Sequence, residues 1–415
     1  MSERRDVLVI GGGIVGVCSA HYLAARGKSV VLLERDDIAS GSSAGNAGFV
    51  CPSHSIPMAQ PGVVAKGLKW MFDPDSPFYI KPRFSPALFS WLWKFRAACT
   101  EERVRRVMTV LRDLHCESVE LFDELSKIPG VAFGWTRRGL LSLFRTGHAY
   151  EAGLKESALL QEIGVPSRAL TPPEIAERVP RAKPGLAGGI HFPGDAHLDP
   201  LAFVRSLASH VGSRGVDVRT GTDVTGFGIT GRKITSVRTT KGEFAADQVV
   251  LAAGSWSPSI GRELRLKIPV QPAKGYSITM PRPEGAPSVP LLLIEAKVGV
   301  TPIGDRLRLA GTLELAGLDL TINERRVEAI RCGAATFLDG LEAAATGEVW
   351  RGLRPCTPDG LPIVGRSAAF DNLILATGHA MIGVSLGPVT GALVAQIACG
   401  EPTDIDLTVL KPERF

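Results

Sequence analysis

A glycine-rich turn between two short apolar runs is the feature that most constrains the fold. Residues 7–10 form an apolar run of the length of a buried parallel strand, and glycines follow at G-x-G-x-x-G spacing. A helical pattern over residues 14–26 leads to a second apolar run, residues 29–33, which ends at Glu34. This order predicts a βαβ unit whose turn holds the phosphates of a dinucleotide. An ordinary βαβ unit with a glycine-rich turn is the alternative.

Each glycine of this turn has its own purpose in dinucleotide binding. Gly11 permits the tight turn, Gly13 removes a side chain that would block a pyrophosphate, and Gly16 lets helix and strand pack closely. The first N–H groups of the helix, from Ile14 onward, then face the phosphates. Glu34 can accept hydrogen bonds from both ribose hydroxyls, and its charge disfavours a 2′-phosphate.

Length and composition bound the class of protein. A chain of 415 residues, 45% hydrophobic and 21% charged, predicts two domains or one large domain with an elaborated second lobe. The net charge of +5 is mild and the basic residues are scattered, so nucleic acid is not an expected partner. Seven cysteines without a C-x-x-C pair predict reduced thiols. With the nucleotide fold beginning at residue 6 and no apolar run of membrane-spanning length, we expect a cytoplasmic location.

Small residues mark the places where the chain returns to the nucleotide. The loop over residues 38–48 is almost entirely Gly, Ala and Ser, which suits contact with a flat or phosphorylated group, although a flexible linker is the alternative. Residues 249–254 form another buried strand that ends in small residues, and residues 348–400 return once more. The remaining segments lack the Rossmann pattern of alternating strands and helices, and they predict a second, α+β lobe. We expect a cleft between this lobe and the nucleotide-binding domain.

The predicted domain division follows from these returns. We assign residues 1–50, 195–262 and 350–415 to the nucleotide-binding domain, and residues 51–194 and 263–349 to a substrate-binding domain built on an antiparallel or mixed sheet. The fold class is therefore α/β with a Rossmann-type domain and an α+β domain.

Aromatic and basic residues alternate over residues 52–96, where seven prolines interrupt long elements. Our preferred interpretation is that the aromatics fill a core beneath an irregular lobe, because the amphipathic periodicity is poor. The alternative is an interfacial patch that contacts a bilayer, which would make the protein peripheral on the inner face of the cell membrane. The aromatic residues are Trp70, Phe72, Phe78, Tyr79, Phe84, Phe89, Trp91, Trp93 and Phe95.

Two histidines and two aspartates within residues 191–199 raise the question of a metal site. Their spacing matches no ligand pattern, and Asp199 followed by Pro200 is typical of a helix cap and first turn. We therefore predict a structural segment and no metal.

Five segments give the chain its family resemblance: the N-terminal unit, GSSAGNAG (41–48), PVQPAKGYS (269–277), WRGLRPCTPDGLPIVG (350–365) and NLILATGHAMIGVSLGP (372–388). Together they resemble the D-amino-acid oxidase and glycine oxidase superfamily, and most of all the FAD-dependent D-amino-acid dehydrogenases of the small-subunit type. The resemblance implies FAD as the cofactor and oxidation of an amino or imino acid at Cα. After His379 the family often has Gly-Thr-Leu-Gly-Trp, whereas this chain has Ala-Met-Ile-Gly-Val.

Three residues are the candidates for the catalytic site. Arg354 suits a buried substrate carboxylate because its guanidinium is a planar fork, and the resemblance assigns that role to the equivalent arginine. The alternative is a structural ion pair with Asp359. Tyr276 can hydrogen-bond the same carboxylate or serve in packing. His379 is either a base or a core histidine held by the backbone.

The segment 377–383 and the small-residue loops supply the expected cofactor contacts. Glycines there permit close approach to a flat ring, and nearby N–H groups can receive negative charge. Related proteins that bind flavin through a cysteine have it where this chain has Gly352, which favours non-covalent FAD. The expected cofactor-binding residues are Gly11, Gly13, Ile14, Gly16, Glu34, Arg35, Ser42, Ser43, Asn46, Ala47, Gly48, Val224, Ala253, Gly254, Gly378, His379, Met381 and Gly383.

The predicted reaction is oxidative deamination of a D-amino acid to a 2-oxo acid and ammonia. A hydride passes from Cα to flavin N5, and the electrons go on to a quinone or another acceptor that is not oxygen. The alternatives are a D-hydroxyproline or proline dehydrogenase, a glycine or sarcosine oxidase that makes hydrogen peroxide, a flavin-fold scaffold without turnover, and a NAD-binding module.

Overall fold

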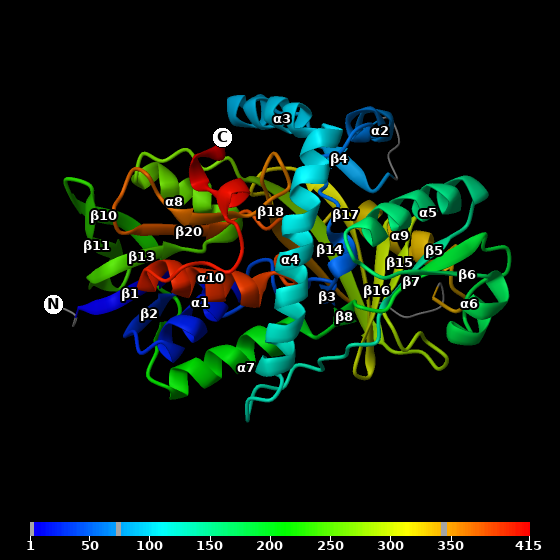
Figure 1. The fold of residues 1–415 in the computed structure, drawn as a ribbon, viewed down its shortest axis with the longest axis horizontal. Coiled ribbons are helices and arrows are strands. Elements are labelled where there is room, and N and C mark those ends of the chain that lie inside the picture. The colour runs from blue at the N-terminus through cyan, green and yellow to red at the C-terminus, as the bar shows by residue number, and fades with distance from the viewer. Residues whose placement is uncertain (1–3, 72–75, 342–346) are drawn as a thin grey trace.

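Two large β-sheets, each covered by helices, make up most of the protein (Figure 1). The computed structural model describes residues 4–71, 76–341 and 347–415. The first sheet contains the N-terminal strand, the second contains the middle of the chain, and the long helix α4 (Glu101–Leu125) passes between them.

The first sheet has six strands and is parallel except at one edge, where β19 runs antiparallel to β20. Alternate residues of β1 enter different cores, because successive strand residues face opposite sides: Val7 and Val9 pack with the helices, and Leu8 and Ile10 pack with a small sheet. The strand order is β19 (Ile363–Arg366), β20 (Leu373–Thr377), β13 (Ala246–Leu251), β1 (Arg5–Ile10), β2 (Val30–Leu33) and β9 (Asp217–Arg219).

Helices cover one face of this sheet, and a three-stranded antiparallel sheet with a short helix covers the other. The helices of the first face are α1 (Ile14–Ala25), α7 (Pro200–Ser213) and α10 (Gly387–Cys399). The elements of the second face are β10 (Val224–Thr230), β11 (Lys233–Thr239), β12 (Gly242–Phe244) and α8 (Ser257–Glu263).

The second sheet has nine strands and is mixed, because two of its strand pairs are parallel and the rest are antiparallel. Its order is β18 (Glu348–Cys356), β14 (Gln271–Pro281), β17 (Arg306–Leu315), β16 (Val298–Ile303), β15 (Leu291–Leu293), β5 (Leu140–Phe144), β7 (Gly188–Phe192) and β6 (Arg168–Leu170), with β4 (Phe78–Ile80) paired to β17. The predicted fold class, a Rossmann-type domain beside an α+β domain with a mixed sheet, is confirmed.

Helix α9 (Glu324–Ala335) and α6 (Pro172–Arg178) pack on one face of the second sheet, and α5 (Gly147–Glu162) packs on the other. Thr171 caps α6 through a capping box with Glu174, and Asp199 caps α7 by accepting hydrogen bonds from the N–H groups of Leu201 and Ala202. The structural interpretation of residues 191–199 is therefore confirmed for Asp199.

Helix α4 packs against α10, through Val107, Leu111 and Leu114 facing Val389 and Leu393. The predicted boundaries place α4 in the substrate-binding domain, and the division of the chain into domains stays a prediction. Within the described residues, no helix combines the length and apolar character needed to cross a membrane.

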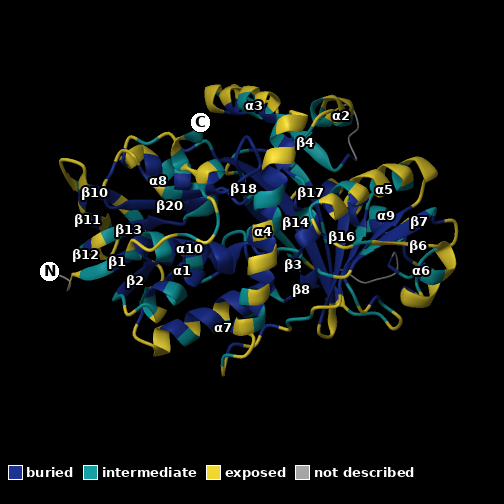
Figure 2. Cartoon of the chain, viewed as in Figure 1, coloured by how far each residue is buried: buried dark blue, intermediate teal, exposed yellow. Residues whose placement is uncertain are grey.

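The preferred interpretation of residues 52–96 is wrong for part of the segment. Two helices form there, α2 (Val63–Met71) and α3 (Pro86–Ala98), and Ser85 caps α3 by accepting from the N–H of Leu88. Trp91 enters the core, whereas Phe84 is 91% exposed and Trp93 is 72% exposed. Figure 2 shows the exposed residues along both helices. Phe72 lies outside the described residues.

Candidate active site

The glycine-rich turn has the geometry that a dinucleotide requires. Gly11 has φ of +114°, a conformation that side chains rarely adopt. A Cβ on Gly16 would lie 1.8 Å from the carbonyl oxygen of Gly11, so helix α1 can approach the turn only without a side chain there. A Cβ on Gly13 would meet only the hydroxyl of Ser43, 3.5 Å away, which leaves the helix N-terminus open toward a ligand. The turn therefore fits the pyrophosphate of FAD.

Glu34 lies at the end of β2, beside this turn. Its carboxylate accepts hydrogen bonds from the N–H of Gly12 at 2.6 Å and from the N–H of Asp36 at 2.9 Å. Arg35 pairs with Asp36 at 3.0 Å and stacks its guanidinium 4.8 Å from the ring centre of Trp256. These contacts hold the acid in the position where a ribose of the dinucleotide would lie.

The loop over residues 41–48 lies on the second sheet. Arg308 of β17 donates to the carbonyl of Ala44 at 3.1 Å and to that of Asn46 at 2.8 Å, and Thr301 of β16 donates to the carbonyl of Ala47 at 2.6 Å. The indole of Trp350 covers Gly45, where a Cβ would lie 2.0 Å from the ring. The sheet therefore fixes the shape of this loop.

The remaining polar groups of the loop bind the start of helix α1, strand β18 and each other. Ser43 accepts from the N–H of Ile14 at 3.1 Å, and Ser42 donates to the carbonyl of Leu353. Asn46 accepts from the N–H of Gly48 at 2.9 Å. The loop thus joins the glycine-rich turn to strand β18.

Other predicted cofactor-binding residues lie at the ends of neighbouring strands. Ala253 and Gly254 follow β13 next to the turn, and a Cβ on Gly11 would lie 2.5 Å from the carbonyl of Ala252. Val224 lies at the start of β10, two residues after Thr222, whose N–H donates to the carbonyl of Glu34 at 2.8 Å, and its contact with the cofactor stays a prediction.

Residues 378–383 follow β20 and lie beside the cavity, but only some of their side chains line it. Gly378 has φ of +81°, and a Cβ there would lie 2.5 Å from Thr357. Gly383 packs against the Cβ of His379. Met381 is half exposed and lines the cavity.

A cavity of about 1440 Å³ lies over the second sheet. Its lining is mostly apolar and aromatic, as is usual for a ligand site. The loop contributes Ser42, Gly45, Asn46 and Ala47, so the cavity reaches the predicted cofactor site. The sheet contributes small residues on four successive strands, namely Gly352 of β18, Gly275 of β14, Ala310 of β17 and Gly299 of β16.

Arg354 lines this cavity from strand β18. Its guanidinium lies on Gly275, where a Cβ would be 1.9 Å from Nη1, and donates to the carbonyls of Thr312 at 2.6 Å and Gly311 at 3.3 Å. Burial lowers the pKa of Arg354, against the raising influence of Cys356. Among the residues that the structure describes, no carboxylate forms a salt bridge with this guanidinium. Such a group suits an anion brought by a ligand.

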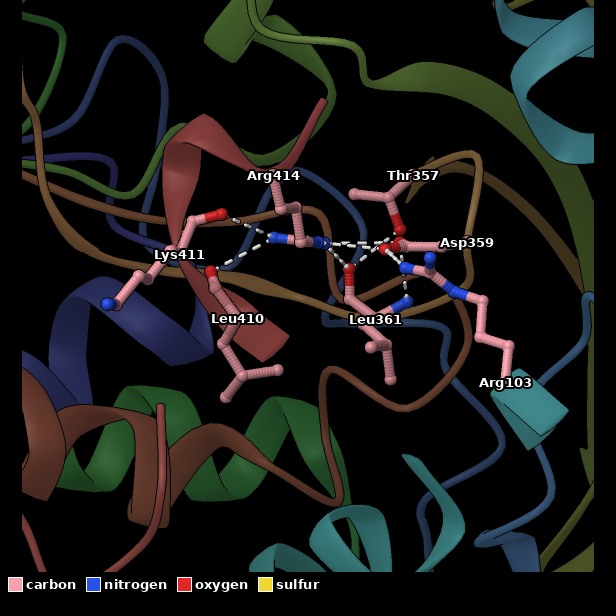
Figure 3. A network of polar contacts seen from close by, with 7 residues as sticks. All are labelled: Arg103, Thr357, Asp359, Leu361, Leu410, Lys411 and Arg414. Carbon is pink, nitrogen blue, oxygen red and sulfur yellow. Dashed lines mark hydrogen bonds and ion pairs between the residues drawn. The ribbon is translucent and has the colours of Figure 1, made fainter. Parts of the chain in front are cut away.

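The alternative partner of Arg354, Asp359, is occupied elsewhere (Figure 3). Its buried carboxylate accepts from Arg103 at 2.6 Å and from Arg414 at 2.8 and 3.1 Å. Arg414 also donates to the carbonyl of Leu361 at 2.8 Å. The alternative prediction, an ion pair between Arg354 and Asp359, is therefore wrong, because Arg414 pairs with Asp359 instead.

Tyr276 needs a correction, because its side chain points away from Arg354. Gly275 faces the cavity, so the next residue of the strand must face the other side of the sheet. There the Tyr276 hydroxyl donates to Glu314 at 3.0 Å, and burial, followed by the charge of Glu314, raises its pKa. Packing is thus its role, and it is not a partner for a carboxylate on Arg354.

His379 is a packed core residue. Its Nε2 atom lies 2.9 Å from the hydroxyl of Thr390, and the side chain is 3% exposed. Burial lowers its pKa to about 3, so the ring stays neutral near pH 7. Burial therefore disfavours a role for His379 as a catalytic base.

A buried carboxylate also lies beside the cavity. Asp195 accepts from the N–H of Ser53 at 3.1 Å and from its hydroxyl at 2.5 Å, and Ser53 lines the cavity. Burial raises the pKa of Asp195 to about 7, although hydrogen bonds from Ser53 and Cys51 lower it. The sequence gives no sign of this burial, because the acid follows an ordinary Pro-Gly turn.

The mouth of the cavity carries an apolar rim on α2, α3 and the segment before α3. We define the apolar rim as Leu68, Met71, Phe84, Phe89 and Trp93, all of which are exposed. Leu68, Met71, Phe89 and Trp93 also line the cavity, as do Lys66, Lys81, Arg83 and Arg96.

Two positions at the site were not among the predicted residues. Gly275 supports the guanidinium, and a glycine inside a strand is a recognised sign of close approach. Arg308 is 5% exposed and binds the loop over residues 41–48. The sequence does not indicate this, because an arginine that alternates with apolar residues in a strand is equally typical of an exposed position.

A Rossmann-type sheet with an open glycine-rich turn, next to a large cavity on a second sheet, is the arrangement of a dinucleotide-dependent redox enzyme. Residues 6–397 match the family described as FAD dependent oxidoreductase, and the chain belongs to this family. The prediction of FAD as the cofactor is confirmed by that membership.

Curated relatives and solved structures agree with this family. A D-amino acid dehydrogenase from Methylobacterium nodulans is 37% identical over 416 residues, and one from Xanthobacter autotrophicus is 35% identical over 416 residues; each alignment covers 99% of both chains. Glycine oxidase from Geobacillus kaustophilus superposes with a TM-score of 0.82 at 25% identity over the whole of both chains. L-proline dehydrogenase from P. horikoshii shares the fold, with a TM-score of 0.80 at 22% identity over 100% of this chain and 98% of its own.

Proposed function

We propose that this chain catalyses the oxidative deamination of D-amino acids to 2-oxo acids and ammonia. The observation that carries the proposal is Arg354, a guanidinium in the wall of a large apolar cavity without a carboxylate partner in the described residues. Full-length similarity to chains named D-amino acid dehydrogenase supports the same reaction class.

The substrate would lie between Arg354 and the cofactor loop. A bidentate contact with Arg354 would fix the α-carboxylate, and the adjoining cavity would hold Cα and the amino group. FAD supplies the acceptor for the Cα hydride when it is bound. Gly11, Gly13 and Glu34 would hold its dinucleotide part without a covalent bond. Burial raises the pKa of the Cys356 thiol to about 12, which disfavours the thiolate that a covalent link requires.

The proposed reaction requires no side-chain base. The amine must be neutral before the hydride leaves, and it can lose its proton to water before it enters the apolar cavity. His379 is buried against Thr390 and Tyr276 faces the other side of the sheet, so neither supports a proton-transfer role.

The proposed electron acceptor is a quinone, reached from a peripheral position on a membrane. The apolar rim supports this assignment, since four of its five exposed side chains line the cavity together with basic residues such as Lys66 and Arg83. Apolar side chains would enter the headgroup region while lysines and arginines contact anionic lipids.

Anaerobic titration of the purified flavoprotein tests the proposed function. D-amino acids should bleach the flavin absorbance, and their L-isomers should do so far more slowly. Reoxidation by a quinone-like dye should exceed peroxide formation in air. Fast peroxide production would favour the glycine or sarcosine oxidase alternative, preferential bleaching by D-proline or D-hydroxyproline would favour an imino-acid dehydrogenase, and no bleaching by any amino acid would overturn the proposal.

A further inference from the structure

The carbonyls that hold Arg354 belong to an irregular part of strand β17. The guanidinium donates to the carbonyls of Thr312 and Gly311, and Thr312 has φ of +65°. A β-branched residue keeps such a conformation only where the surrounding structure holds it. The position of the proposed anchor therefore depends on contacts that fix residues 311–313 against strand β14, where they pass Gly275.

Three side chains join these two strands on the back face of the second sheet, which is the face opposite the cavity of Arg354. We call Lys274, Tyr276 and Glu314 the back-face triad, and all three are buried. The Tyr276 hydroxyl donates to the Oε2 atom of Glu314 at 3.0 Å, and the Nζ atom of Lys274 lies 3.8 Å from the same oxygen. Away from water such polar contacts are stronger than they would be at the surface.

The triad spans the bulge of β17. Lys274 pairs in register with Glu314 on one side of the bulge, and Tyr276 pairs with Gly311 on the other. Lys274 and Tyr276 are also the two chain neighbours of Gly275, the residue that the bulge opposes. One carboxylate oxygen therefore ties the positions before and after Gly275 to a residue just beyond the bulge, which keeps the extra residue of β17 in place.

The charged members of the triad act at a distance from the substrate site. In the described part of the chain, Lys274 and Glu314 line a separate cavity of about 480 Å³ and do not line the larger one. Lys274 also donates to the carbonyl of Thr321 at 2.9 Å, and its Nζ atom lies 3.6 Å from Asp319. Any effect of Glu314 on a substrate must therefore pass through the strands.

We propose that Glu314 is a positioning residue for the carboxylate anchor. It holds the bulge of β17 through Tyr276 and Lys274, and the bulge presents the two carbonyls that bind the guanidinium of Arg354. This inference rests on the proposed function, since it takes Arg354 as the group that binds the substrate carboxylate. Loosening the triad should move the guanidinium, weaken the binding of carboxylates and raise KM.

Tyr276→Phe tests the inference on the FAD-loaded enzyme, because it removes one hydroxyl and keeps the ring that packs in the core. Propionate binding, followed by the change in flavin absorbance, measures the anchor without turnover. The dissociation constant should rise about tenfold, and KM for a D-amino acid should rise by a similar factor while kcat changes less. Glu314→Gln keeps an acceptor for the Tyr276 hydroxyl but removes the charge beside Lys274, and it should act in the same direction.

Tyr79→Phe is the matched control. Tyr79 lies on β4, which pairs in register with Glu314 along the edge of β17 away from β14. Among the described residues, the carboxylate of Glu314 accepts its tyrosine hydrogen bond from Tyr276 and not from Tyr79. The control variant should leave the dissociation constant of propionate within about twofold of wild type.

A double variant separates positioning from a general loss of stability. In the Arg354→Ala background, Tyr276→Phe should change kcat/KM by no more than about twofold, because the group that the triad positions is already gone. The same fold-change with and without Arg354 would overturn the inference. A lower Tm with unchanged propionate affinity in Tyr276→Phe and Glu314→Gln would overturn it as well, because the triad would then only stabilise the sheet.

Reduction of the flavin by amino acids distinguishes this inference from the proposed function. If no amino acid bleaches the flavin but Tyr276→Phe still weakens propionate binding, only the proposed reaction is overturned. If D-amino acids bleach the flavin and both variants bind propionate as wild type does, the positioning role of Glu314 is overturned and the reaction stands. A wild type that binds no propionate would overturn the anchor and this inference with it.

Discussion

The Nη1 atom of Arg354 lies 2.6 Å from the carbonyl oxygen of Thr312, and this hydrogen bond sets the guanidinium on the surface of Gly275. Thr312 has φ of +65°, a conformation that a β-branched residue rarely adopts. It occupies a bulge of β17, where Thr312 and Leu313 together oppose the single residue Gly275 between two paired positions. The bulge therefore turns the carbonyl toward Arg354 and aims the arginine into the cavity.

Replacing Arg354 tests the carboxylate anchor directly. Arg354→Ala should raise the activation free energy by about 3–5 kcal/mol, because a buried carboxylate would lose its partner. This corresponds to a loss in kcat/KM of about a hundredfold to several thousandfold. Arg354→Lys should recover only part of the loss, since an ammonium cannot make the bidentate contact. Steady-state kinetics with a quinone-like dye measures both.

The matched control for this variant lies on the same strand. Arg351 donates to the carbonyl of Leu320 at 3.0 Å and faces the opposite side of the sheet, because it is three residues from Arg354. Arg351→Ala should leave kcat/KM within about twofold of wild type. Equal losses for the two variants would show that Arg354 acts through the stability of the sheet.

Gly275 offers a second test, in which the anchor is displaced without being removed. A Cβ there would lie 1.9 Å from Nη1 of Arg354, so Gly275→Ala must move the guanidinium. A displacement of about 1 Å costs on the order of a hundredfold in rate, and we expect that loss in kcat/KM. Gly212→Ala is the control, because a Cβ at Gly212 in α7 would meet nothing within 4 Å. It should leave activity unchanged and raise stability by about 0.4–1 kcal/mol.

The first βαβ unit could be predicted from the sequence because its signals are local. The apolar runs, the three glycines and Glu34 all lie within residues 7–34, and each constrains its immediate neighbours. The apolar periodicity of residues 101–127 predicts a helix for the same reason, and helix α4 lies there, at Glu101–Leu125.

The orientation of side chains in the second sheet could not be predicted in the same way. Whether Tyr276 or Gly275 faces the cavity depends on the pairing register with β18, and a change of one residue exchanges the two faces. The partner of Asp359 is Arg414, 55 residues later, which no local pattern indicates. Phe84 and Trp93 are residue types typical of a core, and they are exposed because α3 and the segment before it lie at the surface.

Asp195 should make stability depend on pH in a defined direction. Its pKa is about 7 in the folded protein, against 3.8 ordinarily, because burial disfavours the charged form. Between about pH 4 and 7 the folded state therefore holds a proton that the unfolded state has released. The stability contributed by the neutral carboxyl is present below pH 4 and is lost as the pH rises through 7.

The variant Asp195→Asn should remove this dependence, because an amide keeps an acceptor for the N–H of Ser53 and does not ionise. The free energy of unfolding of wild type relative to the variant should fall by on the order of several kcal/mol from pH 4 to pH 7 and level off above, and the difference in Tm should follow it. Thermal unfolding followed by circular dichroism measures it. Asp371→Asn, at an exposed position, is the control and should give a difference that changes little with pH. A flat difference for Asp195→Asn would show that the carboxyl is already ionised below pH 7.

The apolar rim predicts binding to vesicles. Phe84 and Trp93 are 91% and 72% exposed, and burying each in a bilayer interface should contribute about 1.5–3 kcal/mol. The double variant Phe84→Ser and Trp93→Ser should therefore lose at least tenfold in affinity for vesicles that contain anionic lipid, measured by co-sedimentation. Raising the salt concentration should weaken wild-type binding further, since the nearby lysines and arginines contribute through charge.

The control for the rim is an exposed apolar side chain elsewhere in the molecule. Ile229, 45% exposed, lies on β10 in the small sheet that covers the first sheet, and Ile229→Ser should leave vesicle binding unchanged. The double rim variant should also keep its Tm, because exposed side chains contribute little to the folded core. If it keeps wild-type affinity for vesicles, the rim does not contact the bilayer, and the electron acceptor must reach the cavity from water.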